Sequence, residues 1–248
     1  MRDSVIYAVG IGPGGSEYLV PRARRVLEEA EIVVGYRPYL ELLGDLLADK
    51  QLVSTGMRGE VERCRQALEL AREGRTVAVV SSGDAGIYGM AGLLLELIEA
   101  DGDRLEVEVV PGVSAANAAA ATLGAPLMND FVVLSLSDQL TPLTVIRERV
   151  GAVAAADLVC AIYNPQSRGR RQLFPEAVEE FIRVRGPQTI AGLVRNAGRE
   201  GESRWLGRLD ELPVAEVDMV TIVIIGNSET AIINDRMVTR RGYLDGDD

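Results

Sequence analysis

A glycine-rich stretch near the start of the chain, VGIGPGGSEYL, has the residue types and spacing of a dinucleotide-binding loop. Gly10, Gly12 and Gly15 satisfy the pattern G-x-G-x-x-G. The full fingerprint also needs an acidic residue at the end of the next strand to hold the ribose, but that strand is expected to end at Tyr36. Pro13 removes one backbone N–H from the loop that would hold a pyrophosphate. The stretch therefore indicates close backbone approach to a ligand and argues against NAD or FAD.

Four further turns of small and polar residues follow apolar, strand-like runs: SSGDAGIYG, PGVSAAN, NPQSRGR and RNAG. Ligands of open α/β sheets bind beyond the carboxyl ends of the strands, so these turns predict a ligand crevice lined mainly by backbone. Asp84 could accept hydrogen bonds from hydroxyls or pair with an ammonium group there. Its alternative role is to cap a helix near Tyr88. Ser114 is expected to be the N-cap of an alanine-rich helix, which is compatible with ligand contact.

The absence of histidine excludes Ser-His-Asp and Cys-His nucleophile systems and histidine metal sites. Cys64 and Cys160 have no CxxC spacing, so we expect two buried apolar side chains and neither a disulfide framework nor a metal site. A net charge of −11 argues against binding to nucleic acid or to an anionic membrane. A small-molecule partner is therefore favoured, with any chemistry supplied by a cosubstrate.

Runs rich in valine and isoleucine alternate with amphipathic patterns, which is typical of an α/β protein. The turn-forming stretch GAPLMND predicts an N-terminal α/β domain at residues 1–128 and a C-terminal α/β domain at residues 129–248. The chain start lacks a signal-peptide pattern and no apolar run has spanning length, so a cytoplasmic location is expected. Strands are expected at residues 5–11, 31–34, 76–81, 105–110, 131–136, 158–163, 189–194 and 219–225, and helices include 114–123 and 172–184.

In this order, the motifs GIGPGG, SSGDAGIYG and VVPGVSAANAAAATLGAP resemble those of the tetrapyrrole (corrin/porphyrin) methylase family. The later blocks IYNPQSRGRR, VRNAGREGE and VTIVIIGNSET resemble its carbon-17 branch, which acts on precorrin-3B or cobalt-factor III. The resemblance covers essentially the whole chain. It implies S-adenosylmethionine-dependent methylation of carbon 17 with contraction of the macrocycle, in cobalamin biosynthesis. It also implies a homodimer of chains with two α/β domains and a ligand cleft between them.

The resemblance also implies which residues contact S-adenosylmethionine. Asn164 agrees with the carbon-17 branch, whereas Ala85 stands where many members have proline, so we expect a slightly looser turn there. The loop at Gly12 is expected to lie beside the tetrapyrrole. Carried over by motif, the family's contacts to the methyl donor fall on Pro13, Ser82, Gly83, Asp84, Ile87, Ser114, Ala115, Asn164, Ala197 and Thr221.

A tetrapyrrole carries many carboxylates, so an acidic protein needs local positive charge to bind it. We expect this charge from a group of arginines, with the alternative that SRGRR is a solvated surface turn. A sulfonium methyl is already electrophilic, so the protein must chiefly align it and exclude water, and no residue is assigned to proton transfer. Alternative functions are methylation of another ring position, a nucleotide-dependent oxidoreductase and a non-catalytic corrinoid carrier. The arginines are Arg58, Arg168 and Arg195, with Arg170, Arg171 and Arg199 as further members.

Overall fold

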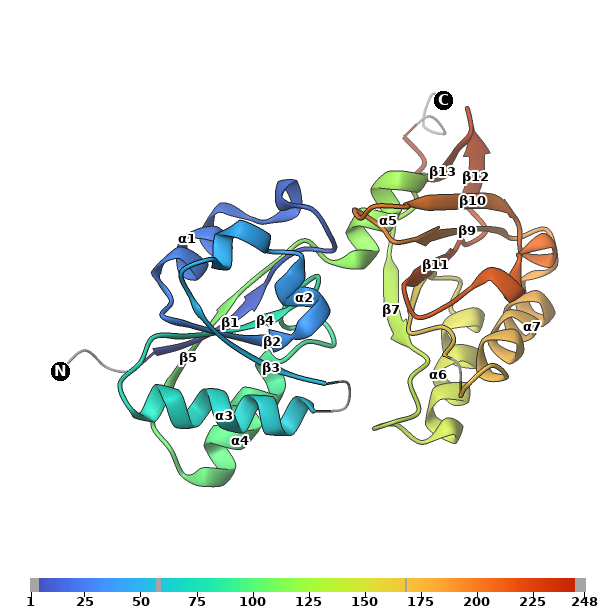
Figure 1. Cartoon of the computed structure of the whole chain (residues 1–248). Helices are drawn as coiled ribbons and strands as arrows, with labels where there is room; N and C mark the ends of the chain where they lie inside the picture. Colours follow the sequence, from blue (N-terminus) through green and yellow to red (C-terminus); the bar gives the residue numbers. More distant parts are fainter. Residues whose placement is uncertain (1–4, 57–58, 168, 244–248) are drawn as a thin grey trace. The chain divides into compact units, whose positions relative to one another are not determined.

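The computed structural model describes residues 5–56, 59–167 and 169–243, and it consists of two compact units (Figure 1). One unit ends at Ala115 and the other begins at Ala116, whereas the sequence placed the boundary after Met128. The division comes earlier because strand β6 (Gly124–Ala125) pairs with β13 (Arg236–Thr239) near the end of the chain. This pairing ties the segment that follows helix α5 (Ala115–Leu123) to the C-terminal unit.

The N-terminal unit is a parallel five-stranded sheet with the strand order β3-β2-β4-β1-β5. Helices α1 and α2 cover one face and α3 and α4 cover the other (Figure 1). The strands are β1 (Val5–Gly10), β2 (Ile32–Tyr36), β3 (Gln51–Thr55), β4 (Val77–Ser81) and β5 (Glu106–Val110). The helices are α1 (Pro21–Glu29), α2 (Arg37–Glu41), α3 (Glu60–Arg72) and α4 (Ala91–Asp101).

Both faces of this sheet carry a hydrophobic core, which explains why its three central strands, β2, β4 and β1, are continuous apolar runs. In β2, Ile32 and Val34 belong to the core under α3 and α4, whereas Val33 belongs to the core under α1 and α2. The predicted α/β fold is confirmed. The edge strand β3 was not predicted, because most of its residues are exposed and carry little apolar pattern.

The C-terminal unit has a mixed sheet with the order β10-β9-β11-β8-β7. Strand β7 runs parallel to β8, whereas β11 runs antiparallel to both β8 and β9. A small second sheet has the order β12-β13-β6. The strands are β7 (Phe131–Ser135), β8 (Val159–Tyr163), β9 (Ile190–Arg195), β10 (Ser203–Arg208), β11 (Thr221–Ile225) and β12 (Thr230–Ile233).

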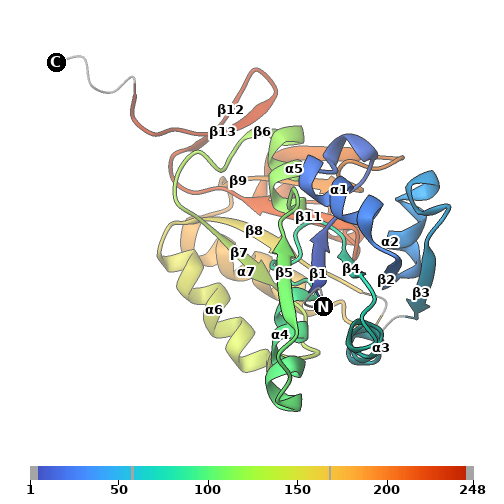
Figure 2. The ribbon, with the colours of Figure 1, turned by 90° about the vertical axis from the view of Figure 1, so that its left-hand side faces the viewer.

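Helices α6 (Leu143–Ala155) and α7 (Leu173–Arg185) pack against each other and against one face of the mixed sheet (Figure 2). Phe174 and Phe181 of α7 are fully buried in this core. On the opposite face, Gly192 of β9 leaves room for α5, because a Cβ there would lie 2.7 Å from Leu123 Cδ1. The sheet therefore has helices on both faces.

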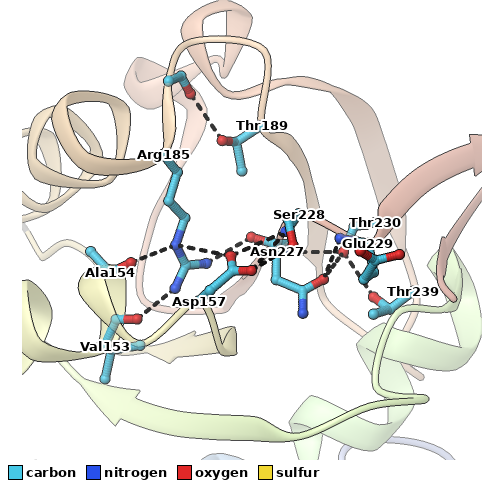
Figure 3. Close-up of polar contacts among 12 residues, drawn as sticks. Val153, Ala154, Asp157, Arg185, Thr189, Asn227, Ser228, Glu229, Thr230 and Thr239 are labelled. Carbon is cyan, nitrogen blue, oxygen red and sulfur yellow. Dashed lines mark hydrogen bonds and ion pairs between the residues drawn. The ribbon is translucent and has the colours of Figure 1, made fainter. Parts of the chain in front are cut away.

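The buried side chain of Arg185, at the end of α7, forms hydrogen bonds with the end of α6 and with the residue after β11 (Figure 3). Its guanidinium donates to the carbonyl oxygens of Val153 (2.5 Å), Ala154 (2.9 Å) and Gly226 (2.8 Å). The side chain is 6% exposed, and its Nε lies 4.0 Å from an oxygen of Asp157. Burial lowers the pKa of this guanidinium, yet it stays charged at neutral pH. Arg185 thus satisfies carbonyls at the end of α6 and beyond β11.

Candidate functional site

Three neighbouring strands of the N-terminal sheet, β4, β1 and β5, end in glycine-containing loops that meet at one edge of the sheet. Gly12 and Gly83 exchange two backbone hydrogen bonds, with N–O distances of 3.0 and 2.7 Å. Both have positive φ angles, 79° and 70°, a conformation that glycine adopts without steric cost. The loops after β1 and β4 are therefore locked together by main chain alone.

The third loop, which follows β5 and contains Gly112, packs against the loops after β1 and β4 just as closely. A Cβ on Gly112 would lie 2.2 Å from the carbonyl oxygen of Gly83, and one on Gly10 would lie 2.7 Å from the Gly112 nitrogen. The glycines are therefore required for contact between loops. The N–H groups of Gly12 and Gly83 each donate to the carbonyl oxygen of the other glycine, so they are not available to bind a pyrophosphate. This argues further against the oxidoreductase alternative.

Asp84 is the carboxylate of this edge, and it links two of the loops. Its Oδ1 accepts from the Gly86 N–H at 2.8 Å and its Oδ2 from the Gly112 N–H at 3.0 Å. The alternative role as a helix cap is wrong, because α4 begins only at Ala91 and no side chain caps its N-terminus. A carboxylate oxygen has a second lone pair, so Asp84 can still accept from a ligand.

Other predicted donor contacts lie in the same three loops. Pro13 is buried beside Gly12, and Ser82 is half-buried next to Gly83. Ile87 lies three residues after Asp84 in the same loop, and it is a large apolar side chain that is 38% exposed. Ser114 is buried directly before α5, and Ala115 is the first residue of that helix. These loops thus present an exposed apolar side chain, a carboxylate and backbone along one sheet edge.

The C-terminal unit has a corresponding edge, formed by the ends of β7, β8 and β9 and by the beginning of β11. Because β11 is antiparallel, its first residue, Thr221, pairs with Arg195 at the end of β9. Ser135 ends β7 beside Tyr163 at the end of β8. The predicted contacts Asn164, Ala197 and Thr221 are therefore gathered at one edge of this unit: Asn164 directly after β8, buried Ala197 just after β9, and Thr221 at the start of β11.

Two of these residues are held by specific contacts. Asn164 has a φ of 50°, and its side-chain nitrogen donates to the Ser135 hydroxyl at 3.0 Å. Thr221 is 1% exposed, and its hydroxyl donates to Asp218 Oδ1 at 2.8 Å. The hydroxyl of Thr221 is therefore buried and already hydrogen-bonded. Arg195 pairs with the other oxygen of Asp218 at 2.9 Å and is half-exposed, so it can still face a large anionic ligand.

The remaining predicted arginines have different outcomes. Arg58 and Arg168 lie outside the described residues. Arg170 is 11% exposed and pairs with Asp138, so this part of SRGRR is not a solvated turn. Tyr163 was not selected from the sequence, yet its hydroxyl accepts from the Ala116 N–H at 2.8 Å near the start of α5. A tyrosine at the end of an apolar strand carries no signal that distinguishes this contact.

Both cysteines are buried, as predicted. Desolvation raises the pKa of Cys64 to about 11 and that of Cys160 to about 12, so neither thiol is a nucleophile at neutral pH. Within residues 5–56, 59–167 and 169–243, no three His, Cys, Asp or Glu side chains cluster as metal ligands would. In the same ranges no helix has the length and apolarity needed to cross a bilayer.

The fold and its loops define the class of protein. Residues 5–213 match the family Tetrapyrrole (Corrin/Porphyrin) Methylases, so the chain belongs to this family, as its motifs suggested. The crystal structure of the methyltransferase CobJ has a TM-score of 0.90 and 34% identity, over 95% of this chain and 99% of that one. Uroporphyrin-III C-methyl transferase from Thermus thermophilus, complexed with S-adenyl homocysteine, has a TM-score of 0.68 and 27% identity, over 89% and 96%.

Sequence relatives point to one branch of the family. The chain is 46% identical to the probable cobalt-factor III C(17)-methyltransferase of Salmonella typhimurium, over 96% of this chain and 99% of that protein. It is 41% identical to a protein of the same name from Methanocaldococcus jannaschii, over 97% and 98%. The cobalt-factor III methyltransferase of Priestia megaterium is 44% identical, but the chain spans only 45% of its length. The predicted resemblance to the carbon-17 branch is confirmed.

Proposed function

We propose that this protein transfers a methyl group from S-adenosylmethionine to carbon 17 of cobalt-factor III in cobalamin biosynthesis, with the accompanying contraction of the macrocycle. The observation that carries the proposal is the 46% identity to a cobalt-factor III C(17)-methyltransferase over nearly the full length of both chains. Asn164, which agrees with the carbon-17 branch, stands at the strand edge of the C-terminal unit. Precorrin-3B, the metal-free counterpart, is the second candidate substrate.

The residues present suit S-adenosylmethionine. An adenine ring needs apolar contact, and Ile87 exposes an apolar side chain in the loop after β4. Ribose hydroxyls and an ammonium group need acceptors, and Asp84 has lone pairs left after its two backbone hydrogen bonds. The proposed contacts are Pro13, Ser82, Gly83, Asp84, Ile87, Ser114 and Ala115 in the first three loops, and Asn164, Ala197 and Thr221 in the C-terminal unit.

When bound, S-adenosylmethionine supplies an electrophilic methyl group, so the chain's own residues have to position and desolvate the reactants. Interlocked loops suit this task, because Gly12, Gly83 and Gly112 fix the main chain without flexible side chains. Asp84 braces the same loops through two backbone N–H groups. Arg195, with Arg58 and Arg168, would provide local positive charge for the substrate carboxylates, and Gly12 would lie beside the macrocycle.

Incubation with methyl-deuterated S-adenosylmethionine and either cobalt-factor III or precorrin-3B, followed by mass spectrometry, tests the reaction. One labelled methyl group on carbon 17 of the cobalt-containing macrocycle is expected. Label at another carbon, or stronger turnover of precorrin-3B, would overturn the assignment of position or substrate. Binding of the macrocycle without transfer would instead identify a carrier.

We further propose that the protein acts in the cytoplasm as a homodimer. The family resemblance supports the homodimer. Sedimentation analysis at several concentrations tests the dimer: a mass of twice 26.7 kDa is expected, and a single species of 26.7 kDa would refute it.

A further inference from the structure

Arg170 lies in the loop after β8, and its side chain is buried among groups from three loops. Nη1 donates to Asp138 Oδ1 at 3.0 Å, and Nη2 donates to the carbonyl oxygen of Asn164 at 2.8 Å. Nη2 also lies 3.9 Å from the Met219 sulfur, just before β11. The guanidinium therefore connects the segments that follow β7 and β8 with the segment that precedes β11.

The residue that Arg170 holds has a restricted geometry. Asn164 adopts a left-handed backbone conformation with a φ of 50°, which L-residues other than asparagine and aspartate rarely tolerate. Its side-chain amide donates to the Ser135 hydroxyl, which also accepts from the Ser137 N–H at 3.2 Å. Arg170 thus fixes the carbonyl of Asn164, while Ser135 fixes its side chain.

These contacts leave Arg170 little capacity for another ligand. Both terminal nitrogens have partners, and the side chain is only 11% exposed. Its Nε is buried and has no hydrogen-bond partner among the described residues, so the terminal nitrogens alone fix the orientation of the guanidinium. This arrangement disagrees with the expectation that Arg170 binds a tetrapyrrole carboxylate directly.

We propose that Arg170 is a positioning residue that sets the conformation of Asn164 for binding of S-adenosylmethionine. The inference rests on the proposed function, because it takes Asn164 to contact the methyl donor. Asp138 orients the guanidinium, and the guanidinium orients the Asn164 carbonyl. Loss of Arg170 frees the turn after β8, so the binding conformation of Asn164 becomes one of several.

The test compares Arg170→Leu, Arg170→Lys and Asp138→Asn with the wild type and with Arg183→Leu. Arg183 is a matched control because its side chain is 69% exposed and forms an ion pair with Glu180 one helical turn away. For each protein, calorimetry gives the Kd for S-adenosylmethionine, and steady-state kinetics give kcat and the separate KM values for donor and macrocycle. Thermal unfolding, followed by Trp205 fluorescence, shows whether each variant is folded.

Arg170→Leu is expected to raise the Kd and KM for S-adenosylmethionine about tenfold, which corresponds to one charged hydrogen bond, with the macrocycle KM unchanged. Lysine keeps the positive charge beside Asp138 but lacks the two terminal nitrogens of the guanidinium, so Arg170→Lys should bind S-adenosylmethionine more tightly than Arg170→Leu but less tightly than the wild type. Asp138→Asn should weaken donor binding by a smaller factor, and Arg183→Leu should change nothing.

Three results would overturn the inference. A raised macrocycle KM with unchanged donor affinity would make Arg170 a direct substrate ligand. A lower melting temperature with unchanged Kd and KM would make it a structural residue only. A folded Arg170→Leu protein with wild-type values throughout would leave it no role. If the wild type itself binds no S-adenosylmethionine, the proposed function fails, which is a separate outcome.

Discussion

Replacement of Arg185 by leucine removes the guanidinium that satisfies three buried carbonyl groups while keeping an apolar side chain in the same space (Figure 3). A hydrogen bond to a charged group contributes about 1.5–3 kcal/mol. The guanidinium also lies 4.9 Å from the ring of Phe181, a cation–π contact worth about 1–2 kcal/mol where desolvated. Relief of the desolvation cost of Arg185 offsets part of this sum. We expect a net loss of about 3–5 kcal/mol.

The tryptophan of this chain gives a local reading of that loss. Trp205 is the only tryptophan in the sequence, lies in β10 and packs against the core of the C-terminal unit. Its fluorescence during urea or thermal unfolding therefore reports on this unit. A loss of 3–5 kcal/mol should lower the midpoint of thermal unfolding by at least about 10 °C.

Arg183→Leu is the control, because Arg183 is on the same helix and forms an exposed ion pair worth at most about 1 kcal/mol. Equal midpoints for Arg185→Leu and Arg183→Leu would refute the reasoning. Arg185→Lys should fall between the wild type and Arg185→Leu, since an ammonium group can reach some but not all of the carbonyls.

Three other predictions concern single residues. Gly112→Ala should destabilise the N-terminal unit by about 1–3 kcal/mol in circular-dichroism unfolding, because its Cβ would lie 2.2 Å from the carbonyl oxygen of Gly83. Gly92→Ala in α4, where a Cβ meets nothing within 4 Å, should instead be stabilising by up to about 1 kcal/mol. Asp84→Asn places an amide N–H against a backbone N–H, so calorimetry should show weaker S-adenosylmethionine binding; unchanged affinity would contradict the bracing role. Burial raises the pKa of Cys160 to about 12 from an ordinary 9.0, so the unfolded state ionises first and stability should fall as pH rises above 9. Urea midpoints should drop more between pH 8 and 10 for the wild type than for Cys160→Ala, and equal drops would show that the thiol is not the cause.

Strands with both faces buried, such as β1, β2 and β4, were predicted from the sequence. β1, β2 and β4 are apolar runs because the side chains on both faces of each strand are buried in a hydrophobic core. β3 and β10 were missed because their residues are mostly exposed or half-buried and form no apolar run, whereas the edge strands β5 and β7 were predicted from their valine-rich runs. The hairpin of β12 and β13 carried a usable signal in the sequence, the residue pair Asn234-Asp235. Both residues have positive φ angles, as a two-residue turn between paired strands requires, and asparagine and aspartate adopt such angles more readily than most residues.

The candidate site was predicted loop by loop, because small and polar residues after apolar runs mark strand ends. Asp84 was selected in this way and Asn164 through the family resemblance, but their partners were not. Asp84 bonds to Gly112, distant in the sequence, and Asn164 depends on Ser135 and Arg170. No local pattern encodes such pairs, since they arise only when separate strands become neighbours.

By itself the sequence determined the α/β class, the family and the loops that carry the site, because strand runs, turn residues and motifs are written in consecutive positions. Tertiary structure alone decided that β11 runs antiparallel and so brings Thr221 beside Arg195. It also decided that the backbones of Gly12 and Gly83 hydrogen-bond to each other and that the side chain of Arg170 is buried. The physical reason is that strand direction, mutual hydrogen bonding and burial depend on which distant segments pack together, and packing is a property of the whole chain.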